Sequence, residues 1–232
     1  MSFFDALNVY RTTITELFTD PYFIAIWFMF GAINPVLRNN SVLLTSLMQN
    51  TFKKTLYLDS EAGFALMGGW ITYTVGGFIA GPLITATRKY KSVLLTSVSM
   101  ECVSCLIIMV GVYLKNLIVL YIGVFSQGLF LGMANTSLFE IVAEVTYPRP
   151  TMLVTMVNAV GNGIFRLIYP IIGRALISRQ DTFASTCFPF AVTLACSLII
   201  AVISPPYKRS AAHNELDETT NLLKKNDEDD ER

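Results

Sequence analysis

The chain has 232 residues, of which 53% are hydrophobic and 15% are charged, and its mean hydropathy is +0.53. Because ordinary globular domains have about 25% charged residues, this composition excludes a soluble enzyme and indicates a membrane protein. The 17 basic and 17 acidic residues cancel, but residues 215–232 hold eight acids and three bases, which leaves residues 1–214 with 14 bases and 9 acids.

Six apolar runs predict six membrane-spanning helices, and therefore an all-α membrane protein with a transmembrane bundle over residues 22–205. Each run is long enough to cross about 30 Å of hydrocarbon at about 1.5 Å per residue. The runs cover residues 22–48, 62–87, 92–114, 116–139, 152–177 and 182–205. These spans use most of the chain, so no sizeable soluble domain is expected.

The segment ahead of the first span, residues 1–21, lacks the basic, apolar and then small-residue pattern of a secretory signal peptide. An even number of spans puts both termini on the same side of the membrane. Seven bases flank the spans on that side and four on the other, which favours cytoplasmic termini because positively charged loops stay inside. The seven are Arg11, Arg88, Lys89, Lys91, Arg149, Lys208 and Arg209. We therefore expect residues 1–21 to form a cytoplasmic segment.

The first span contains polar residues and a proline in its middle, where a helix is expected to break or kink. The residues are Gly31, Asn34, Pro35, Arg38, Asn39 and Asn40. Transporters bind substrates at broken helices near the midplane of the bilayer, which makes Asn34 a candidate for the substrate pathway. The alternative is that two shorter segments meet at an interfacial loop.

Aromatic side chains gather on the first two spans. Trp70 and Tyr73 are one turn apart on the second span, and Trp27, Phe28 and Phe30 crowd the first. Aromatic rings form cages around quaternary ammonium ions, so Trp70 and Tyr73 are candidates for substrate binding. Helix packing and interfacial aromatic belts produce the same pattern.

The third and fourth spans carry three glutamates. Glu101 lies inside the third span, and Glu140 and Glu144 share a helix face near the cytoplasmic end of the fourth. Carboxylates at such positions neutralise a buried base, bind a proton or bind a cation, and we assign Glu140 and Glu144 to the substrate pathway. The second and fourth spans also contain G-x-x-x-G pairs, which let helices approach closely. They are Gly77 with Gly81, and Gly128 with Gly132.

Cys102 and Cys105 have C-x-x-C spacing, but they lie in an apolar run without hydrophilic neighbours. We interpret them as small apolar side chains rather than as a redox or metal site. The only histidine, His213, is in the tail, so the spans offer no histidine to ligate haem, and no cofactor is expected. The chain has no phosphate-binding loop, no hydrolase triad and no basic face with interleaved aromatics, so neither an enzyme nor a nucleic-acid-binding protein is predicted.

The fifth span carries a polar stripe. Asn158, Asn162 and Arg166 follow one another at intervals of four residues and therefore share one helix face. A buried arginine costs about 2.5 kcal/mol or more in a bilayer, so this face is not expected to point at lipid. It either lines a water-filled substrate pathway or pairs with a carboxylate on another helix.

After the sixth span, residues 206–232 become polar and acidic and are expected to form a disordered cytoplasmic tail. Within it, Glu218, Leu222 and Leu223 match an acidic dileucine pattern, which resembles signals that clathrin adaptors recognise during sorting to endosomes and lysosomes. The same short pattern also arises by chance. The plasma membrane and an endosomal or lysosomal membrane are therefore both open as locations.

Three segments resemble known transporters. Residues 76–91, GGFIAGPLITATRKYK, resemble the loop signature of the major facilitator superfamily, although the acidic residue usual before the basic pair is absent. Residues 139–148, FEIVAEVTYP, are similar to the end of the tenth helix in the feline leukemia virus subgroup C receptor family of that superfamily. Residues 153–163, which include Asn158, fit the eleventh helix of that family. The resemblance runs from about residue 20 to residue 204.

This resemblance implies the C-terminal six-helix half of a twelve-helix transporter, in which substrate binds between two rocking halves. The family is associated with haem export, with choline and ethanolamine uptake, and in a lysosomal relative with vitamin transport. Asn162 stands where the family has a substrate-facing glutamine, and Arg166 stands where an apolar residue is expected. The expected partners are the lipid bilayer, a small organic substrate, and a second six-helix half or a full-length transporter. The competing hypothesis is a truncated, non-transporting isoform that binds or regulates a full-length membrane partner.

Overall fold

A computed structural model describes residues 11–52, 58–149, 151–178, 182–203 and 207–212. This part of the chain is helical apart from short connections, and none of it forms a strand. The long helices are α2 (Pro21–Ile33), α3 (Pro35–Thr51), α4 (Leu58–Thr87), α5 (Tyr90–Tyr113), α6 (Leu117–Thr146), α7 (Thr151–Ser178) and α8 (Thr182–Val202). Short helices precede α2, at Arg11–Leu17, and follow α8, at residues 208–212. The all-α fold predicted from the sequence is confirmed.

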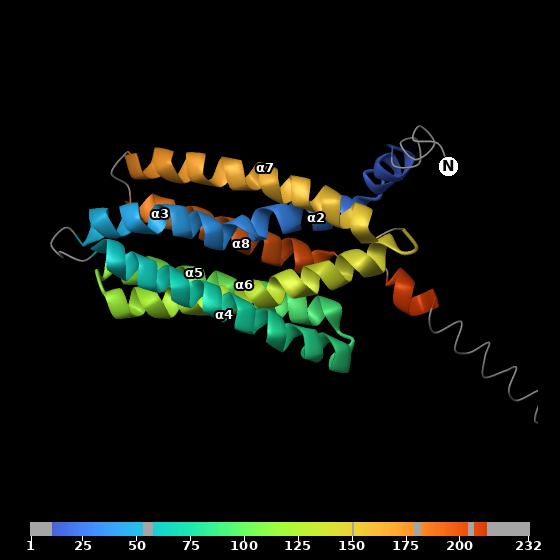
Figure 1. Cartoon of the computed structure of the whole chain (residues 1–232), viewed down its shortest axis with the longest axis horizontal. Helices are drawn as coiled ribbons and strands as arrows, with labels where there is room; N and C mark the ends of the chain where they lie inside the picture. The colour runs from blue at the N-terminus through green and yellow to red at the C-terminus, as the bar shows by residue number, and fades with distance from the viewer. Residues whose placement is uncertain (1–10, 53–57, 150, 179–181, 204–206, 213–232) are drawn as a thin grey trace, which may run out of the picture.

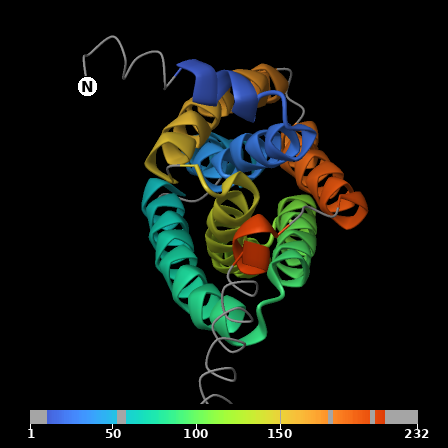
Figure 2. The same ribbon diagram turned by 90° about the vertical axis from the view of Figure 1, so that its right-hand side faces the viewer.

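The long helices run along a common direction and form a layered bundle (Figure 1). Helix α7 packs against α2 and α3, α8 packs against α5, and α6 packs against both α4 and α5. The end-on view places α2 and α7 on one side of the bundle and α4, α5 and α6 on the other (Figure 2). The largest cluster of buried apolar side chains joins these two sides. It includes Phe23, Ile26, Leu94, Val98, Leu131, Leu138 and Ile200.

Helices α4 and α6 touch backbone to backbone through glycines. A side chain at Gly132 would collide with the carbonyl oxygen of Tyr73, and one at Gly76 would collide with that of Leu129. In the predicted G-x-x-x-G pair of α6, Gly128 and Gly132 both make such contacts. In α4, by contrast, the space beside Gly81 is open, so this predicted pair does not work as a unit. Which glycines are needed for close packing depends on where α4 crosses α6, and the spacing of glycines in the sequence does not determine that crossing point.

The first predicted span is interrupted at Asn34, between α2 and α3. The interruption is one residue long, because Asn34 itself keeps helical dihedral angles, with φ −58° and ψ −37°. Pro35 follows it and lacks the backbone N–H that a continuous helix requires. The sequence therefore predicted the position of the break correctly, and the break is narrower than the polar stretch suggested.

Within the part of the chain that the structure describes, four helices are long and apolar enough to cross a membrane. They are Ser60–Thr87 of α4, Tyr90–Tyr113, Leu117–Thr146, and Ser185–Val202 of α8. A fifth candidate joins Arg11–Leu17 to α2 across an 89° bend. The six spans expected from sequence also included α7 and the joined α2 and α3. α7 has 28 residues, but Asn158, Asn162 and Arg166 lower its hydropathy, and it is not among these candidates. It nevertheless packs against α2 and α3 and belongs to the bundle.

Candidate functional site

The polar stripe on α7 lies on a continuous helix that runs from Thr151 to Ser178 and includes Pro170. Asn158 is fully buried, Asn162 is 8% exposed, and Arg166 is half-buried. Neither polar atom of the Asn158 side chain has a hydrogen-bond partner among the described residues, and the same holds for Oδ1 of Asn162. Buried amides are almost always paired in folded proteins, so these atoms are free to bind a group that comes from elsewhere.

Helix α2 covers this part of α7 with aromatic side chains. The indole of Trp27 packs against the backbone of Gly161 and donates a hydrogen bond from Nε1 to the carbonyl oxygen of Val157, at 3.0 Å. One turn further along, Phe165 of α7 packs against Gly31. The two helices therefore meet through glycines and aromatic rings, and the buried amides of α7 lie within this contact region.

Asn34 lies at the junction of α2 and α3 and is half-buried. Its side-chain Nδ2 and its backbone N–H both donate to the carbonyl oxygen of Phe30, at 3.2 Å and 3.4 Å. The donors of Asn34 are thus used within its own helix. Its carbonyl group is the part of the side chain that remains for other contacts.

Glu140 and Glu144 bind the short helix that follows α8. Arg209 reaches both carboxylates, with Nη2 3.4 Å from Oε2 of Glu140 and Nε 3.3 Å from Oε1 of Glu144. Glu144 is fully buried, and Ser210 donates to it from both its backbone N–H and its Oγ, each at 2.9 Å. The base beside these two glutamates is therefore Arg209, and together they fasten residues 207–212 to the end of α6.

Trp70 and Tyr73 form an edge-to-face pair on α4, with ring centroids 5.6 Å apart. The Tyr73 hydroxyl accepts a hydrogen bond from Nδ2 of Asn135 on α6, at 2.6 Å. Helices α4 and α7 lie on opposite sides of the bundle (Figure 1). The structure therefore groups Trp70 and Tyr73 with Asn135 in a second polar cluster, between α4 and α6.

Two polar side chains are fully buried at the centre of the bundle, and sequence reasoning found one of them, Glu101, but missed the other, Gln127. Gln127 of α6 donates to Sγ of Cys105 on α5, at 3.3 Å. Glu101 of α5 is fully buried, and neither of its carboxyl oxygens has a hydrogen-bond partner among the described residues. Neither residue belongs to a longer polar stripe in the sequence, and only the packing of α5 against α6 and α8 shows that both face inward.

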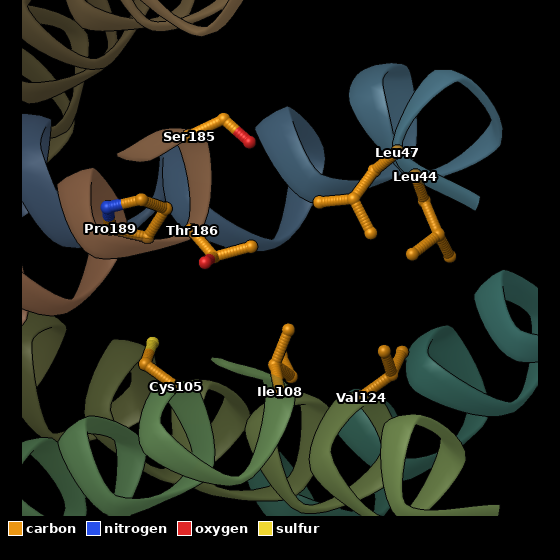
Figure 3. A pocket seen from close by; sticks show the side chains of 8 residues that line it. All are labelled: Leu44, Leu47, Cys105, Ile108, Val124, Ser185, Thr186 and Pro189. Carbon is orange, nitrogen blue, oxygen red and sulfur yellow. The ribbon is translucent and has the colours of Figure 1, made fainter. Parts of the chain in front are cut away.

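A small cavity lies between α3, α5, α6 and α8, near the end of the bundle where α8 begins (Figure 3). It measures about 20 Å³, which is room for one water molecule. Its lining is apolar except for a thiol and two hydroxyls. The lining residues are Leu44, Leu47, Cys105, Ile108, Val124, Ser185, Thr186 and Pro189.

The predicted sorting signal, Glu218, Leu222 and Leu223, lies outside the described residues. It is therefore a prediction from the sequence alone.

Comparison with known proteins identifies the class to which this fold belongs. The sequence matches the Major Facilitator Superfamily over residues 22–226. Because this match covers most of the chain, the chain belongs to this superfamily of membrane transporters, and it is a multi-pass membrane protein with the architecture of one half of the superfamily fold. None of the curated proteins compared with the chain matches it. The narrower resemblance to the feline leukemia virus subgroup C receptor family stays a prediction.

Proposed function

We propose that the chain carries a small organic solute across a membrane by alternating access, and that it supplies one six-helix half of the transporter. The observation that carries this proposal is the pair of buried amides on α7, because three of their polar atoms have no partner among the described residues. These atoms are Nδ2 and Oδ1 of Asn158 and Oδ1 of Asn162. An unpaired buried polar group costs about 1–3 kcal/mol. A bound solute would remove that cost by supplying the missing partner.

Apolar contact area lies beside these amides. The Trp27 indole contacts Gly161, the residue before Asn162, and Phe165 follows one turn later. Solute sites are lined by aromatic and apolar side chains, with a few polar groups that fix orientation. A solute with a flat or apolar body and a small number of polar groups fits this combination.

The positive charge of Arg166, in the polar stripe of α7, favours some substrates of the related family over others. Arg166 carries a fixed positive charge one turn after Asn162, and a guanidinium pairs well with a carboxylate. It repels a cation unless an acid neutralises it. Haem, which carries two carboxylates, is therefore favoured over choline, and ethanolamine is disfavoured for the same reason as choline.

The arrangement in the membrane follows from the same hypothesis. Residues 22–205 form the transmembrane bundle, with the N-terminal segment 1–21 and the acidic tail 206–232 both in the cytoplasm. A second six-helix half, from another chain or a longer form of this one, supplies the opposite wall of the site. The plasma membrane and the endosomal or lysosomal membranes are the proposed locations, with the dileucine pattern of the tail as the signal that a clathrin adaptor reads.

The test measures uptake of labelled haem, choline and ethanolamine into vesicles that contain the full-length protein. Asn162→Ala is expected to reduce uptake of the transported solute by about tenfold, because about 1–3 kcal/mol is lost with one hydrogen bond to a buried group. Asn162→Gln, which restores the residue type of the related family, is expected to keep uptake. Asn50→Ala removes an exposed amide at the end of α3 and serves as the matched control.

Normal uptake by both Asn162→Ala and Arg166→Ala would refute the assignment of the site to α7. Co-purification with a full-length transporter, without uptake by the chain in any combination, would instead favour a regulatory, non-transporting role.

A further inference from the structure

A fully buried carboxyl group, that of Glu101 on α5, lies in the middle of the bundle without a hydrogen-bond partner among the described residues. The four ion pairs among the described residues involve other acids. We propose that Glu101 is a proton-binding site, reached from the cavity beside Cys105, and that its proton is the second ligand of the transporter. The coupling part of this inference rests on the proposed function.

Burial without a counter-charge selects the neutral form of this side chain. An ionised carboxylate moved from water into the interior costs several kcal/mol unless a cation and hydrogen-bond donors surround it. Glu144 shows the alternative in the same molecule, because it is equally buried but binds Arg209 and two donors of Ser210. Glu101 has none of these, so the described arrangement is one that stabilises a protonated carboxyl.

Among the described side chains, the titratable groups that face Glu101 from the surrounding helices are neutral at physiological pH. These groups are thiols and a phenol, which ionise above about pH 8 in water. They are Cys102 and Cys105 on α5, Tyr169 from α7 and Cys196 from α8. From α6, the amide of Gln127 reaches Cys105, and the acid of α4 among the described side chains, Glu61, is hydrogen-bonded to Tyr121.

The nearest base along α7 is Arg166, one turn before Tyr169. A conformation that brings Arg166 closer to Glu101 would favour release of the proton, because an opposite charge stabilises the carboxylate. Alternating access requires the two halves of the transporter to rock against each other. This motion could change the distance between Arg166 and Glu101. Proton release and solute movement would then be linked through α7, which also carries Asn162.

The cavity lies between Glu101 and the end of the bundle where α8 begins, on the proposed route of the proton. Cys105 is four residues after Glu101, so the two side chains lie on the same face of α5, one turn apart. The thiol of Cys105 points into the cavity, where the hydroxyl of Thr186 lies across from it (Figure 3). The cavity has room for one water molecule. A water there would stand one helical turn from the carboxyl group.

Infrared spectroscopy of the full-length protein in lipid nanodiscs tests the proton site directly. At neutral pH the exposed carboxyls are ionised, so a neutral carboxyl gives a C=O stretching band of its own. We expect this band in the wild type and in Glu61→Gln, and its loss in Glu101→Gln. A wild-type spectrum without the band, or a band that survives Glu101→Gln, would overturn the proposal. The variant Ser185→Leu, which fills the cavity, is expected to slow the shift of the band after transfer to heavy water, and an unchanged rate would overturn the access route.

Vesicles that enclose a pH-sensitive dye test the coupling separately. With haem, choline or ethanolamine as the probe, uptake by the wild type should move protons, and both the proton movement and the dependence of uptake on a pH gradient should be lost in Glu101→Gln but kept in Glu61→Gln. Retained coupling in Glu101→Gln would refute the role of Glu101 in coupling even if the infrared band is present. Absence of uptake for all probes would count against the proposed function, and the infrared band would still decide the proton site.

Discussion

The clasp that fastens residues 207–212 to α6 makes a prediction that depends on one buried carboxylate. Glu144 accepts from three donors, namely Nε of Arg209 and the N–H and Oγ of Ser210. Glu144→Gln keeps the shape of the side chain but leaves a single acceptor oxygen, and it removes the negative charge. We expect this change to weaken the docking of residues 207–212, whereas the matched change Glu140→Gln should have little effect.

The size of the effect follows from burial. A hydrogen bond to a charged group contributes about 1.5–3 kcal/mol, and disrupting a buried ion pair costs about 3–5 kcal/mol. The side chain of Arg209 is 46% exposed, so water partly replaces the lost interaction with Glu144. We therefore expect Glu144→Gln to lower the free energy of docking by about 3 kcal/mol, at the low end of this range. That energy corresponds to roughly a hundredfold increase in the undocked population. The pair of Arg209 with Glu140 is exposed on both sides, at 46% and 43%, and is worth about 0–1 kcal/mol.

Limited trypsin digestion in detergent measures this population. Trypsin cleaves after Lys208 and Arg209 only when this segment leaves α6, and the rate follows the open population when opening is fast. Cleavage after Arg88, in the exposed turn between α4 and α5, provides the internal standard. Equal cleavage of the wild type and Glu144→Gln at Lys208 and Arg209 would refute the reasoning, and so would an equal acceleration in Glu140→Gln.

Three further changes have expected outcomes. Gly132→Leu should push α4 away from α6 and lower the midpoint of thermal unfolding, at a cost of about 1–3 kcal/mol or more. Gly63→Leu, which has open space beside it, should leave the midpoint unchanged. Equal midpoints for the two variants would contradict the contact between Gly132 and the backbone of Tyr73. Trp27→Phe removes the bond to Val157 and should cost about 1 kcal/mol in the same measurement. Burial raises the pKa of Tyr207. The neutral Tyr207 side chain therefore stabilises the docked form of residues 207–212 fully below about pH 10, and this stabilisation is lost as pH rises through the raised pKa. Titration of the tyrosinate absorbance should show this late transition in the wild type and not in Tyr207→Phe.

Features that depend on local sequence were predictable. The apolar runs predicted the helices because a span of about 20 apolar residues has few other stable arrangements. Pro35 predicted the break in the first span, because the missing N–H is a property of that residue alone. The burial of Asn158 and Asn162 also followed from their spacing, since a helix in lipid turns a polar face inward.

Features that depend on how helices meet were not predictable. Arg209 lies 69 residues after Glu140 in the sequence, and no pattern in either segment reveals that the two are neighbours. Gly76 is needed for packing on α6, and Gly81 is not, because the crossing of the helices selects among glycines that are locally equivalent. The burial of Gln127 was not predictable for the same reason. It is a single amide next to Gly128, and the glycines of α6 indicated helix packing only.

The ion pairs bear on how this half moves. Those among the described residues lie at one end of the bundle (Figure 1), where three pairs join residues before α2 or after α8 to the end of α6 or to the residues just after it, and the fourth joins Lys208 to Asp20. Arg149 binds Glu16 at 3.2 Å and Lys208 binds Asp20 at 3.4 Å, beside the clasp around Glu144. Exposed pairs contribute about 0–1 kcal/mol each, so the buried carboxylate of Glu144 must supply most of the strength. Because the pairs connect segments of the same half, they favour movement of these helices as one rigid body, and the missing partners of the amides on α7 must then come from a solute or from the opposing half.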